Sequence, residues 1–552
     1  MTSMALFGFH FVDGLVIVVY LAILVLIGGY FSRTQKSLDD FIKGGKQLGW
    51  LPIGISLMAA LNSGIDFVQT PAMVYTVGLV FVTLILGWIP LYPWISRVTI
   101  PFYQRLDVYS AYEYLERRFN VAVRTIGALI FILWRVGWMG AALYVPVLAF
   151  QGATGIDDKR ISAALAILLG VVVTTYTMLG GIKAVVWTDV LQFCIMFAGL
   201  FTMLMIIVSQ VPGGVGEIYE IVRDAPRLNL IAHIPELPNA TVWDRLHQYF
   251  TTEVTAIGII LVVFITHVTT YTCDQVAIQR FQTAKSVKDA RSAIIVNAVT
   301  DSVWILVLGL LGLALYAFYT VSPMPEGSQN SLVVPYFLRE HMPAIGITGL
   351  VLAAITAASL SSVDAAINST TSVVMVDIYS RLLLGRIRPA ENLTPGEARR
   401  EVLISRCVNG ALGVIMIGIA CYIPNMEKSE LYQAANKILS AFFGPLLGIF
   451  LLGMFCRRAT SAGVIVGAFA GIGTSLFFSF FSETPWLQRI CGSLFGSRFV
   501  EFFREISWTW PSPFGIVAVI VVGYVASLIM PAGPTSEPPL TFRRVMQLPA
   551  QR

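Results

Sequence analysis

The chain carries little charge for its length. Asp, Glu, Lys and Arg make up 12% of its 552 residues, about half the share found in soluble domains. Hydrophobic residues make up 56%, and the mean hydropathy is +0.75. This composition argues against a water-soluble protein and is typical of a polytopic membrane protein, because each span needs about 20 apolar residues. The formal charge of +5 does not indicate nucleic-acid binding, since the basic residues are spread over short loops.

Cysteine and histidine are also scarce. There are six cysteines and five histidines, with no CxxC pair and no HExxH motif. These absences argue against a disulfide framework, a zinc site and a membrane-embedded enzyme with a metal cluster. The amino terminus lacks a basic segment and a small-residue cleavage site, so we expect the first apolar run to remain as a helix. The cysteines are Cys194, Cys273, Cys407, Cys421, Cys456 and Cys491.

Apolar runs of membrane-spanning length fill most of the chain. Basic residues gather in alternate loops, whereas the long loops 211–250 and 321–343 contain few of them. The positive-inside rule therefore predicts an external amino terminus and a cytoplasmic carboxyl terminus. No loop is long enough for an independent soluble domain. The thirteen predicted spans lie near 10–31, 49–78, 80–102, 122–150, 161–181, 184–210, 251–274, 292–320, 344–380, 404–424, 430–455, 461–481 and 513–531.

Ionisable residues stand inside several of these spans. An ionisable side chain at membrane depth costs several kcal/mol on insertion scales, so it indicates an ion or substrate pathway. This pattern favours a transporter. The residues concerned are Asp66, Arg135, Asp189, His267, Asp301, Asp364 and Lys437.

The second span is interrupted near its centre. Residues 59–66 read AALNSGID, and Pro71 follows. A discontinuous helix exposes backbone carbonyls and dipole ends that can bind an ion at mid-membrane. The alternative is a proline kink that packing against neighbouring helices relieves. The polar residues Asn62 and Asp66 favour the interrupted helix.

The ninth span is rich in hydroxyl groups. Residues 357–369 read AASLSSVDAAINS, and helical spacing places Ser361 and Ser362 on one face with Ala358. Sodium is a hard cation that prefers several oxygen ligands. The two hydroxyls, together with carbonyls freed in the second span, could supply that shell. Alternatively, the small residues only allow close helix packing, with the hydroxyls bonded to their own backbone.

Several motifs resemble those of the sodium/solute symporter family, and the resemblance runs over about residues 10–480. Within the family, the eleventh span is most similar to the iodide, multivitamin and monocarboxylate cotransporters. The motifs are YEYLERRF at 112–119, GGIKAVVWTDVLQ at 180–192, DQVAIQR at 274–280, the serine pair of the ninth span, and GPLLG at 444–448 with GMF at 453–455.

The resemblance implies an all-α membrane fold. Two inverted five-helix repeats of the leucine-transporter type would be formed by spans two to eleven, and the first core helix would be discontinuous. The implied segments are 1–48 (an extra helix and a cytoplasmic loop), 49–210 (first repeat), 211–250 (external loop), 251–458 (second repeat) and 459–552 (carboxyl-terminal helices and tail).

The resemblance also implies where cations bind. The main sodium site would use carbonyl oxygens of Ala59, Asn62 and Ala358 with the hydroxyls of Ser361 and Ser362.

A second cation is implied at Asp189, which matches an acidic residue that some members use. Those members have a serine where this chain has Asp364, so two carboxylates could share the region. The second-ion chemistry stays open between a second sodium, a proton and one protonated acid.

The substrate pocket of the family falls on residues that differ from those of the sugar transporters. Amides in those transporters are replaced here by an acid, an imidazole and an amine, which makes a sugar a poor candidate. Arg135 could hold a carboxylate or pair with an acid such as Asp66. The implied pocket residues are Asp66, Phe67, Arg135, His267, Thr270 and Lys437.

Together these features predict a secondary active transporter, not an enzyme. We expect sodium-coupled symport of a small organic solute by alternating access across the cell membrane, with a monocarboxylate or other small organic anion as first choice. Sodium-coupled uptake of an amino acid or a sugar is the alternative, and a channel or membrane-embedded enzyme is a more distant one. The expected partners are the solute, sodium and lipid, without nucleic acid. The sequence leaves the oligomeric state open.

Overall fold

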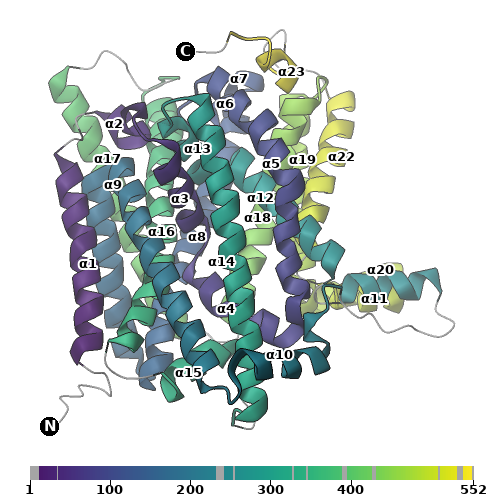
Figure 1. Cartoon of the computed structure of the whole chain (residues 1–552). Coiled ribbons are helices and arrows are strands. Elements are labelled where there is room, and N and C mark those ends of the chain that lie inside the picture. Colours follow the sequence, from purple (N-terminus) through teal and green to yellow (C-terminus); the bar gives the residue numbers. More distant parts are fainter. Residues whose placement is uncertain are drawn as a thin grey trace. The chain divides into compact units, whose positions relative to one another are not determined.

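The computed structural model is helical throughout the part of the chain that it describes (Figure 1). Within that part, the only β-type pairing is an isolated bridge between Leu48 and Ala284. The six cysteines are free thiols. The structure describes residues 11–33, 35, 37–231, 241–252, 255–325, 329–342, 346–387, 394–425, 430–507, 510–530 and 539–549, with side chains from 441 onward in the helix that begins at 430.

The described residues form two compact units whose segments alternate along the chain. Unit 1 comprises the described residues of Met1–Val82, Arg135–Asn229 and Gln279–Tyr432, and unit 2 those of Thr83–Trp134, Leu230–Ile278 and Gln433–Arg552. Each unit therefore joins helices that are far apart in sequence.

Unit 1 is built around a helix that is buried on all sides. In α16 (Ile347–Val373) every residue from 351 to 373 is buried, beneath α9, α3, α4 and α1. Because such a helix faces protein instead of lipid, it can carry polar side chains at membrane depth. The helices of this unit are α1 (Phe11–Ser32), α2 (Leu38–Lys43), α3 (Trp50–Leu61), α4 (Gly64–Val77), most of α8 (Val121–Thr154), α9 (Lys159–Gln210), α10 (Gly214–Asp224), α14 (Val287–Val321), α15 (Val333–Glu340), α16, the π-helical Val374–Leu383 and α17 (Pro395–Tyr422).

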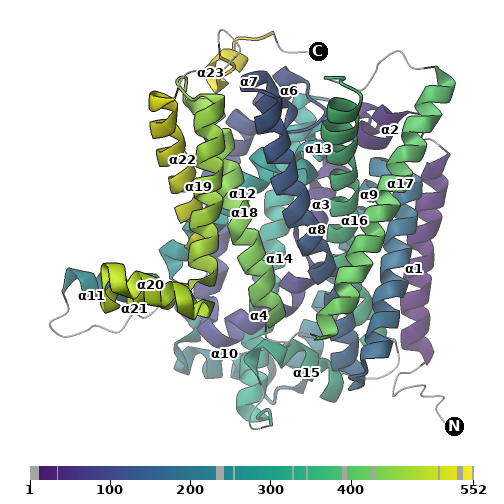
Figure 2. The same ribbon diagram turned by 180° about the vertical axis from the view of Figure 1, so that it is seen from behind.

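Unit 2 contains the remaining helices. Its carboxyl-terminal pair, α19 and α22, lie side by side in both views (Figures 1 and 2). The helices are α5 (Trp88–Trp94), the π-helical Ile95–Thr99, α6 (Ile100–Leu106), α7 (Glu113–Arg118), the start of α8, α11 (Val242–Thr251), α12 (Ala256–Cys273), the start of α13 (Gln275–Thr283), most of α18 (Glu430–Phe455), α19 (Ser461–Phe480), α20 (Pro485–Phe495), α21 (Ser497–Arg504), α22 (Pro511–Ile529) and α23 (Phe542–Val545).

Fewer long helices are found than the thirteen predicted spans. Among the described residues, ten helices are long and apolar enough to cross a membrane, and two shorter apolar helices cover Trp50–Leu61 and Ala441–Phe455. Part of the difference lies in α9, which merges the predicted spans 161–181 and 184–210. Its 52 residues would reach about 78 Å as a straight helix, more than twice a bilayer core of about 30 Å.

Gly181 divides this long helix. Its backbone angles of φ 57° and ψ −161° are not helical, and they lie in a region that L side chains rarely adopt. The chain therefore changes direction between the two apolar halves of α9, close to the boundary that the sequence predicted.

The interface between α19 and α22 depends on small residues. Gly463 and Gly467 of α19 contact Gly523 and Ser527 of α22 so closely that a Cβ atom at Gly467 would lie 2.7 Å from the Gly523 Cα. Small residues at helix interfaces let the backbones approach and gain packing energy that lipid cannot supply.

We expect Gly467→Val to separate α19 from α22 and to destabilise the protein by about 1–3 kcal/mol, the usual range for overpacking. The measurement is the thermal unfolding midpoint in detergent. Gly473→Val is the matched control, because Gly473 is on the same helix and has no atom near its added Cβ position. Equal midpoints for the two variants would contradict the packing argument.

Candidate functional site

The second predicted span is interrupted, as expected. Helix α3 ends at Leu61 and α4 begins at Gly64, while Asn62 and Ser63 have extended backbones. The Ser63 amide donates to the Asp66 carboxylate at 2.7 Å, although in an unbroken helix it would bond to the Ala59 carbonyl. The Asp66 amide bonds to the Ser63 carbonyl at 3.0 Å instead of that of Asn62. The break therefore releases the carbonyl oxygens of Ala59 and Asn62.

Two serine hydroxyls of α16 meet these carbonyls. Ser361 Oγ lies 2.8 Å from the Ala59 oxygen and 3.0 Å from the Ala358 oxygen. Ser362 Oγ lies 3.1 Å from the Asn62 oxygen and 3.5 Å from that of Ala59. Five buried oxygen atoms, from residues 302 positions apart in the case of Ala59 and Ser361, are thus linked by hydrogen bonds where the broken helix meets α16.

This donor set has the chemistry of an alkali-cation site. Three backbone carbonyls and two hydroxyls offer neutral, hard oxygens, the ligand type that hard cations prefer. In the part of the chain that the structure describes, no group of three or more His, Cys, Asp or Glu side chains is arranged to hold a metal ion. The structure thus brings the five predicted sodium ligands together. Their use by sodium remains a prediction.

Two side-chain hydrogen-bond patterns and one close approach at a glycine hold the helix break in place. Asn62 Nδ2 donates to Asp301 Oδ1 at 2.8 Å, and Asp66 accepts from both the amide and the hydroxyl of Ser63 as the capping carboxylate of α4. Gly64 faces the Ser359 hydroxyl and the Ile355 carbonyl of α16, so an added Cβ would collide. The conformation of the break is consequently determined by its neighbours in α14 and α16.

Asp189 takes part in a buried ion pair. Its Oδ2 lies 2.9 Å from Arg280 Nη2 and accepts from Ser56 Oγ at 2.5 Å, and Arg280 Nε also donates to that serine at 2.7 Å. The side chains of both charged residues are fully buried. Arg280 follows the predicted span 251–274 and, by position, would be a basic residue of the next loop; instead it is buried inside unit 1 and compensates the charge of Asp189.

Asp364 has a different set of neighbours. Tyr176 donates its hydroxyl to Oδ2 at 2.7 Å, and the Thr188 hydroxyl lies 3.4 Å from the same oxygen. Oδ1 has no hydrogen-bond partner among the described residues, and one helical turn further the same holds for both amide atoms of Asn368. The two candidate residues for a second cation therefore have different hydrogen-bond partners, and only Asp189 pairs directly with an arginine, although the charges of Asp189 and Arg280 also act on Asp364.

The predicted substrate residues are distributed over the two units. In unit 1, Phe67 is fully buried with its ring 5.6 Å from that of Trp304, and the Arg135 guanidinium lies 5.4 Å from the ring centre of Trp138. Asp66, also in unit 1, acts as a helix cap. These contacts give Asp66 and Phe67 structural roles, and their contact with substrate remains a prediction.

The other substrate candidates belong to unit 2. His267 Nδ1 lies 2.9 Å from the Val263 carbonyl, and its ring meets that of Trp88 edge-on. Thr270 donates to the carbonyl one turn earlier at 3.0 Å. Lys437 is on α18, and its side chain lies outside the described part of the chain.

Ser56, Tyr176 and the role of Arg280 were not predicted from the sequence. Ser56 lies one turn before Ala59 on α3, so its face could have been inferred from helical spacing. Tyr176 is 188 residues from Asp364, and no local pattern relates them. A buried arginine that follows a span looks, in sequence, like an ordinary loop cation.

We expect Ser361→Ala and Ser362→Ala each to lower the apparent sodium affinity by roughly fivefold to a hundredfold, since each removes one oxygen ligand worth about 1–3 kcal/mol. The measurement is sodium-dependent thermal stabilisation of the purified protein. Ser369→Ala is the control, because Ser369 is equally buried on α16 but bonds only to its own helix. Unchanged sodium dependence in both site variants would refute the placement.

The buried ion pair supports a second prediction. Arg280→Gln leaves Asp189 charged and uncompensated, and we expect a loss of about 3–5 kcal/mol of stability. The double variant Asp189→Asn/Arg280→Gln should recover most of it, because no isolated charge remains. Thermal unfolding in detergent measures both effects, and a double variant as unstable as the single one would contradict the pairing.

Three comparisons relate the chain to known proteins. The sequence model of the sodium:solute symporter family matches residues 41–471. The chain is 31% identical over 471 residues to the sodium/sialic acid symporter SiaT of Proteus mirabilis, covering 85% of this chain and 90% of that protein. It is 32% identical over 492 residues to the sodium-coupled monocarboxylate transporter 1 of Xenopus laevis, with 85% and 72% covered. A solved substrate-bound, outward-open sodium-coupled sialic acid symporter superposes with a TM-score of 0.79 at 27% identity, covering 96% of this chain and 99% of that one.

Proposed function

Because the chain belongs to the sodium:solute symporter family, we propose that it uses the sodium gradient to take up a small organic anion. The family and the proteins it resembles are sodium-coupled transporters, so the chain is a multi-pass membrane symporter and sodium is its coupling ion. The motif-based prediction of the family is confirmed. The substrate class, the ion sites and the orientation that follow are our proposals.

The observation that carries the coupling proposal is the meeting of five oxygens between the broken helix and α16. A sodium ion bound there would hold the α3–α4 break and α16 at one fixed distance from each other. A ligand shifts a conformational equilibrium only by its difference in affinity between the states. A site assembled from two separate elements has this property, because any movement of α16 away from the break removes two hydroxyls and one carbonyl from the ion.

The driving force is sufficient for accumulation. One sodium ion moving inward gains about 2.3 kcal/mol per 100 mV of membrane potential and about 1.4 kcal/mol per tenfold concentration gradient. An anionic solute returns one charge of the electrical term, which favours a second coupled cation. We place that cation at Asp364, which makes no ion pair with an arginine among the described residues; Asp189 and Asp364 each keep one carboxylate oxygen without a hydrogen-bond partner there. Asp189 is the weaker candidate, because Arg280 already balances its charge.

An anionic substrate is supported by a buried cation. Arg135 is 3% exposed, lies midway along α8, and stacks over Trp138. A guanidinium can bind a carboxylate through two parallel hydrogen bonds. The relatives described above are named for sialic acid and for monocarboxylates, and both are acids. We assign Arg135 the recognition of the substrate carboxylate; Asp66, Phe67, His267, Thr270 and Lys437 stay the other substrate residues that the family resemblance implies.

The membrane topology is part of the proposal. We retain two inverted repeats within residues 49–210 and 251–458, thirteen crossings, an external amino terminus and a cytoplasmic carboxyl terminus. The length of α9 supports two crossings in place of one, since 52 residues exceed a single span of about 20. The distribution of basic residues supports the orientation.

A ligand screen with purified protein tests the substrate class. Organic acids, amino acids, sugars and vitamins are compared by thermal shift in sodium and in potassium buffer. We expect a carboxylate to stabilise the protein only in sodium, and the same compound to enter proteoliposomes down an imposed sodium gradient. Sodium-dependent stabilisation by a neutral sugar and by no acid would overturn the anion proposal while leaving the sodium coupling intact.

We expect Arg135→Gln to raise the KM for the anion roughly tenfold or more, because a charge-assisted hydrogen bond contributes about 1.5–3 kcal/mol. The apparent sodium affinity measured without substrate should change little. Arg135→Lys is the control: it keeps the charge, loses the bidentate geometry, and should show an intermediate KM. Equal losses of sodium and substrate binding in Arg135→Gln would argue for a structural role instead.

A further inference from the structure

Three amphipathic helices of unit 2 project sideways from the ends of its membrane spans. They are α11, α20 and α21, which we call the shelf (Figures 1 and 2). The chain passes from α19 through one short helical turn, Phe481–Glu483, into α20 and α21, and α22 then begins at Pro511. Helix α11 ends at Thr251, and α12 begins at Ala256. The shelf is thus joined to the ends of α12, α19 and α22.

The inner side of the shelf is packed firmly by aromatic residues. The ring of Phe502 on α21 stacks 5.0 Å from Trp243 of α11, and Phe503 packs 5.1 Å from Phe478 of α19. The Ser507 amide donates to the Phe250 carbonyl at 3.0 Å. Because α11 and α21 are fixed to each other and to a membrane span, the shelf has a defined orientation within unit 2.

The outer side of α20 carries a ridge of exposed apolar residues. Trp486, Ile490 and Leu494 follow each other at intervals of four, so they lie along one face, and they are 62%, 48% and 69% exposed. Arg489 and Ser493 lie on the neighbouring polar face, and both are exposed. A helix with one apolar and one polar exposed face is typical of segments that lie in the plane of a membrane surface.

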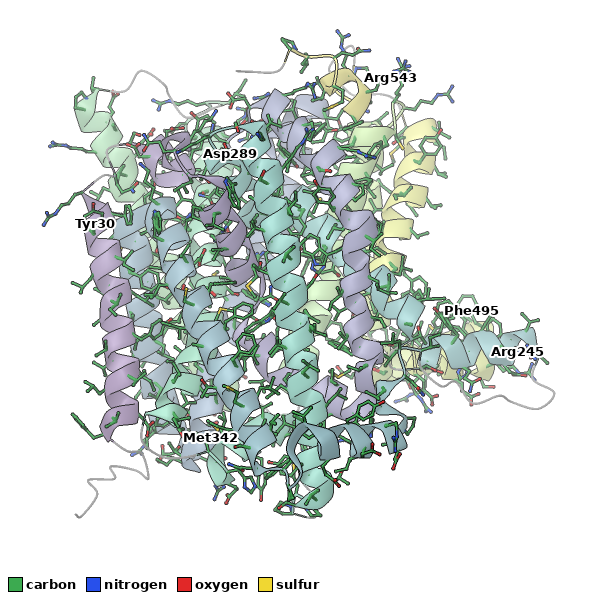
Figure 3. The ribbon with its side chains drawn as sticks, viewed as in Figure 1. Tyr30, Arg245, Asp289, Met342, Phe495 and Arg543 are labelled. Atoms are coloured by element: carbon green, nitrogen blue, oxygen red, sulfur yellow. The ribbon has the colours of Figure 1, made fainter. Side chains whose placement is uncertain are left out.

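Helix α11 shows the same division, whereas α21 exposes only its polar face. In α11, Val242 and Leu246 are exposed on the apolar face, while Asp244 and Arg245 are exposed on the polar face. In α21 the charged residues return at helical spacing, with Arg498, Glu501 and Arg504 on the exposed side. Figure 3 shows Phe495 of α20 and Arg245 of α11 on the shelf, beyond the upright helices.

The ridge continues the exposed apolar surface of α19. That surface indicates which partner covers the ridge. Leu476 and Phe480, in the last turns of α19, are 38% and 37% exposed on a membrane-spanning helix, and α20 begins five residues after Phe480. The exposed apolar surface of a span faces lipid, so the ridge extends a lipid-facing surface at the level where the span ends. Trp486 also belongs to the residue types that are enriched at membrane interfaces.

We propose that the shelf lies in the boundary between lipid headgroups and acyl chains of one leaflet. Its apolar ridge faces the acyl chains, and its arginine-bearing faces are directed toward phosphates and water. The ends of α12, α19 and α22 are thereby held at the membrane surface. This arrangement fits phospholipid and does not depend on which solute is transported.

Photo-crosslinking in vesicles of phosphatidylcholine and phosphatidylglycerol tests the proposal. The full chain carries benzoylphenylalanine at Ile490, at Leu494 or, as the matched control on the same helix, at Arg489. We expect lipid adducts at positions 490 and 494, detected by mass spectrometry, to exceed those at 489 by roughly fivefold or more. Equal yields at all three positions would overturn the proposal.

The same experiment separates lipid from protein partners. Crosslinks from positions 490 and 494 to a second copy of the chain, in place of lipid, would show an interface between protomers and would overturn the lipid assignment. Each variant is first required to elute as a single species and to keep its sodium-dependent thermal stabilisation. Trp486 provides a third ridge position if either of the other two substitutions prevents folding.

Discussion

The interrupted hydrogen-bond pattern between Leu61 and Gly64 is the feature on which the proposed mechanism depends. A regular helix leaves no carbonyl oxygen available at membrane depth, since each one accepts from an amide four residues later. Here the amides of Ser63 and Asp66 bond elsewhere, and the carbonyls of Ala59 and Asn62 are left without their helical partners. The break would be costly in hydrocarbon, and it is tolerated because the freed groups meet hydroxyls from α16.

This arrangement explains why α16 has no lipid-facing side. A helix that carries Ser361, Ser362, Asp364 and Asn368 at mid-membrane needs protein around its full circumference, and α9, α3, α4 and α1 provide it. The buried polar groups of unit 1 are then balanced locally: Asp189 by Arg280 and Ser56, Asp301 by Asn62, and one oxygen of Asp364 by Tyr176. The shelf of unit 2 shows the reverse case: in unit 1 polar groups are buried within the protein, whereas the shelf places apolar side chains at the membrane surface.

The break and the serine pair could be predicted from the sequence because both signals are local. Helix breakers and oxygen donors stand together within residues 59–66, and two hydroxyls stand next to each other in α16. The sequence also predicted separate spans on either side of Gly181, where the structure has one long helix with a single non-helical residue. Asp66 stays a predicted pocket residue, and its spacing from Ser63 makes it the helix cap of α4 as well.

The sequence by itself determined the class of protein and the family, because hydrophobic length and family motifs are properties of consecutive residues. It also predicted the donor atoms of the proposed cation site, which stand close together in two short segments. Tertiary structure alone decided the partners of the buried charges. Arg280 meets Asp189 across 91 positions, and Tyr176 meets Asp364 across 188. Such pairs depend on which helix faces pack together, and helical periodicity specifies a face without specifying its neighbour.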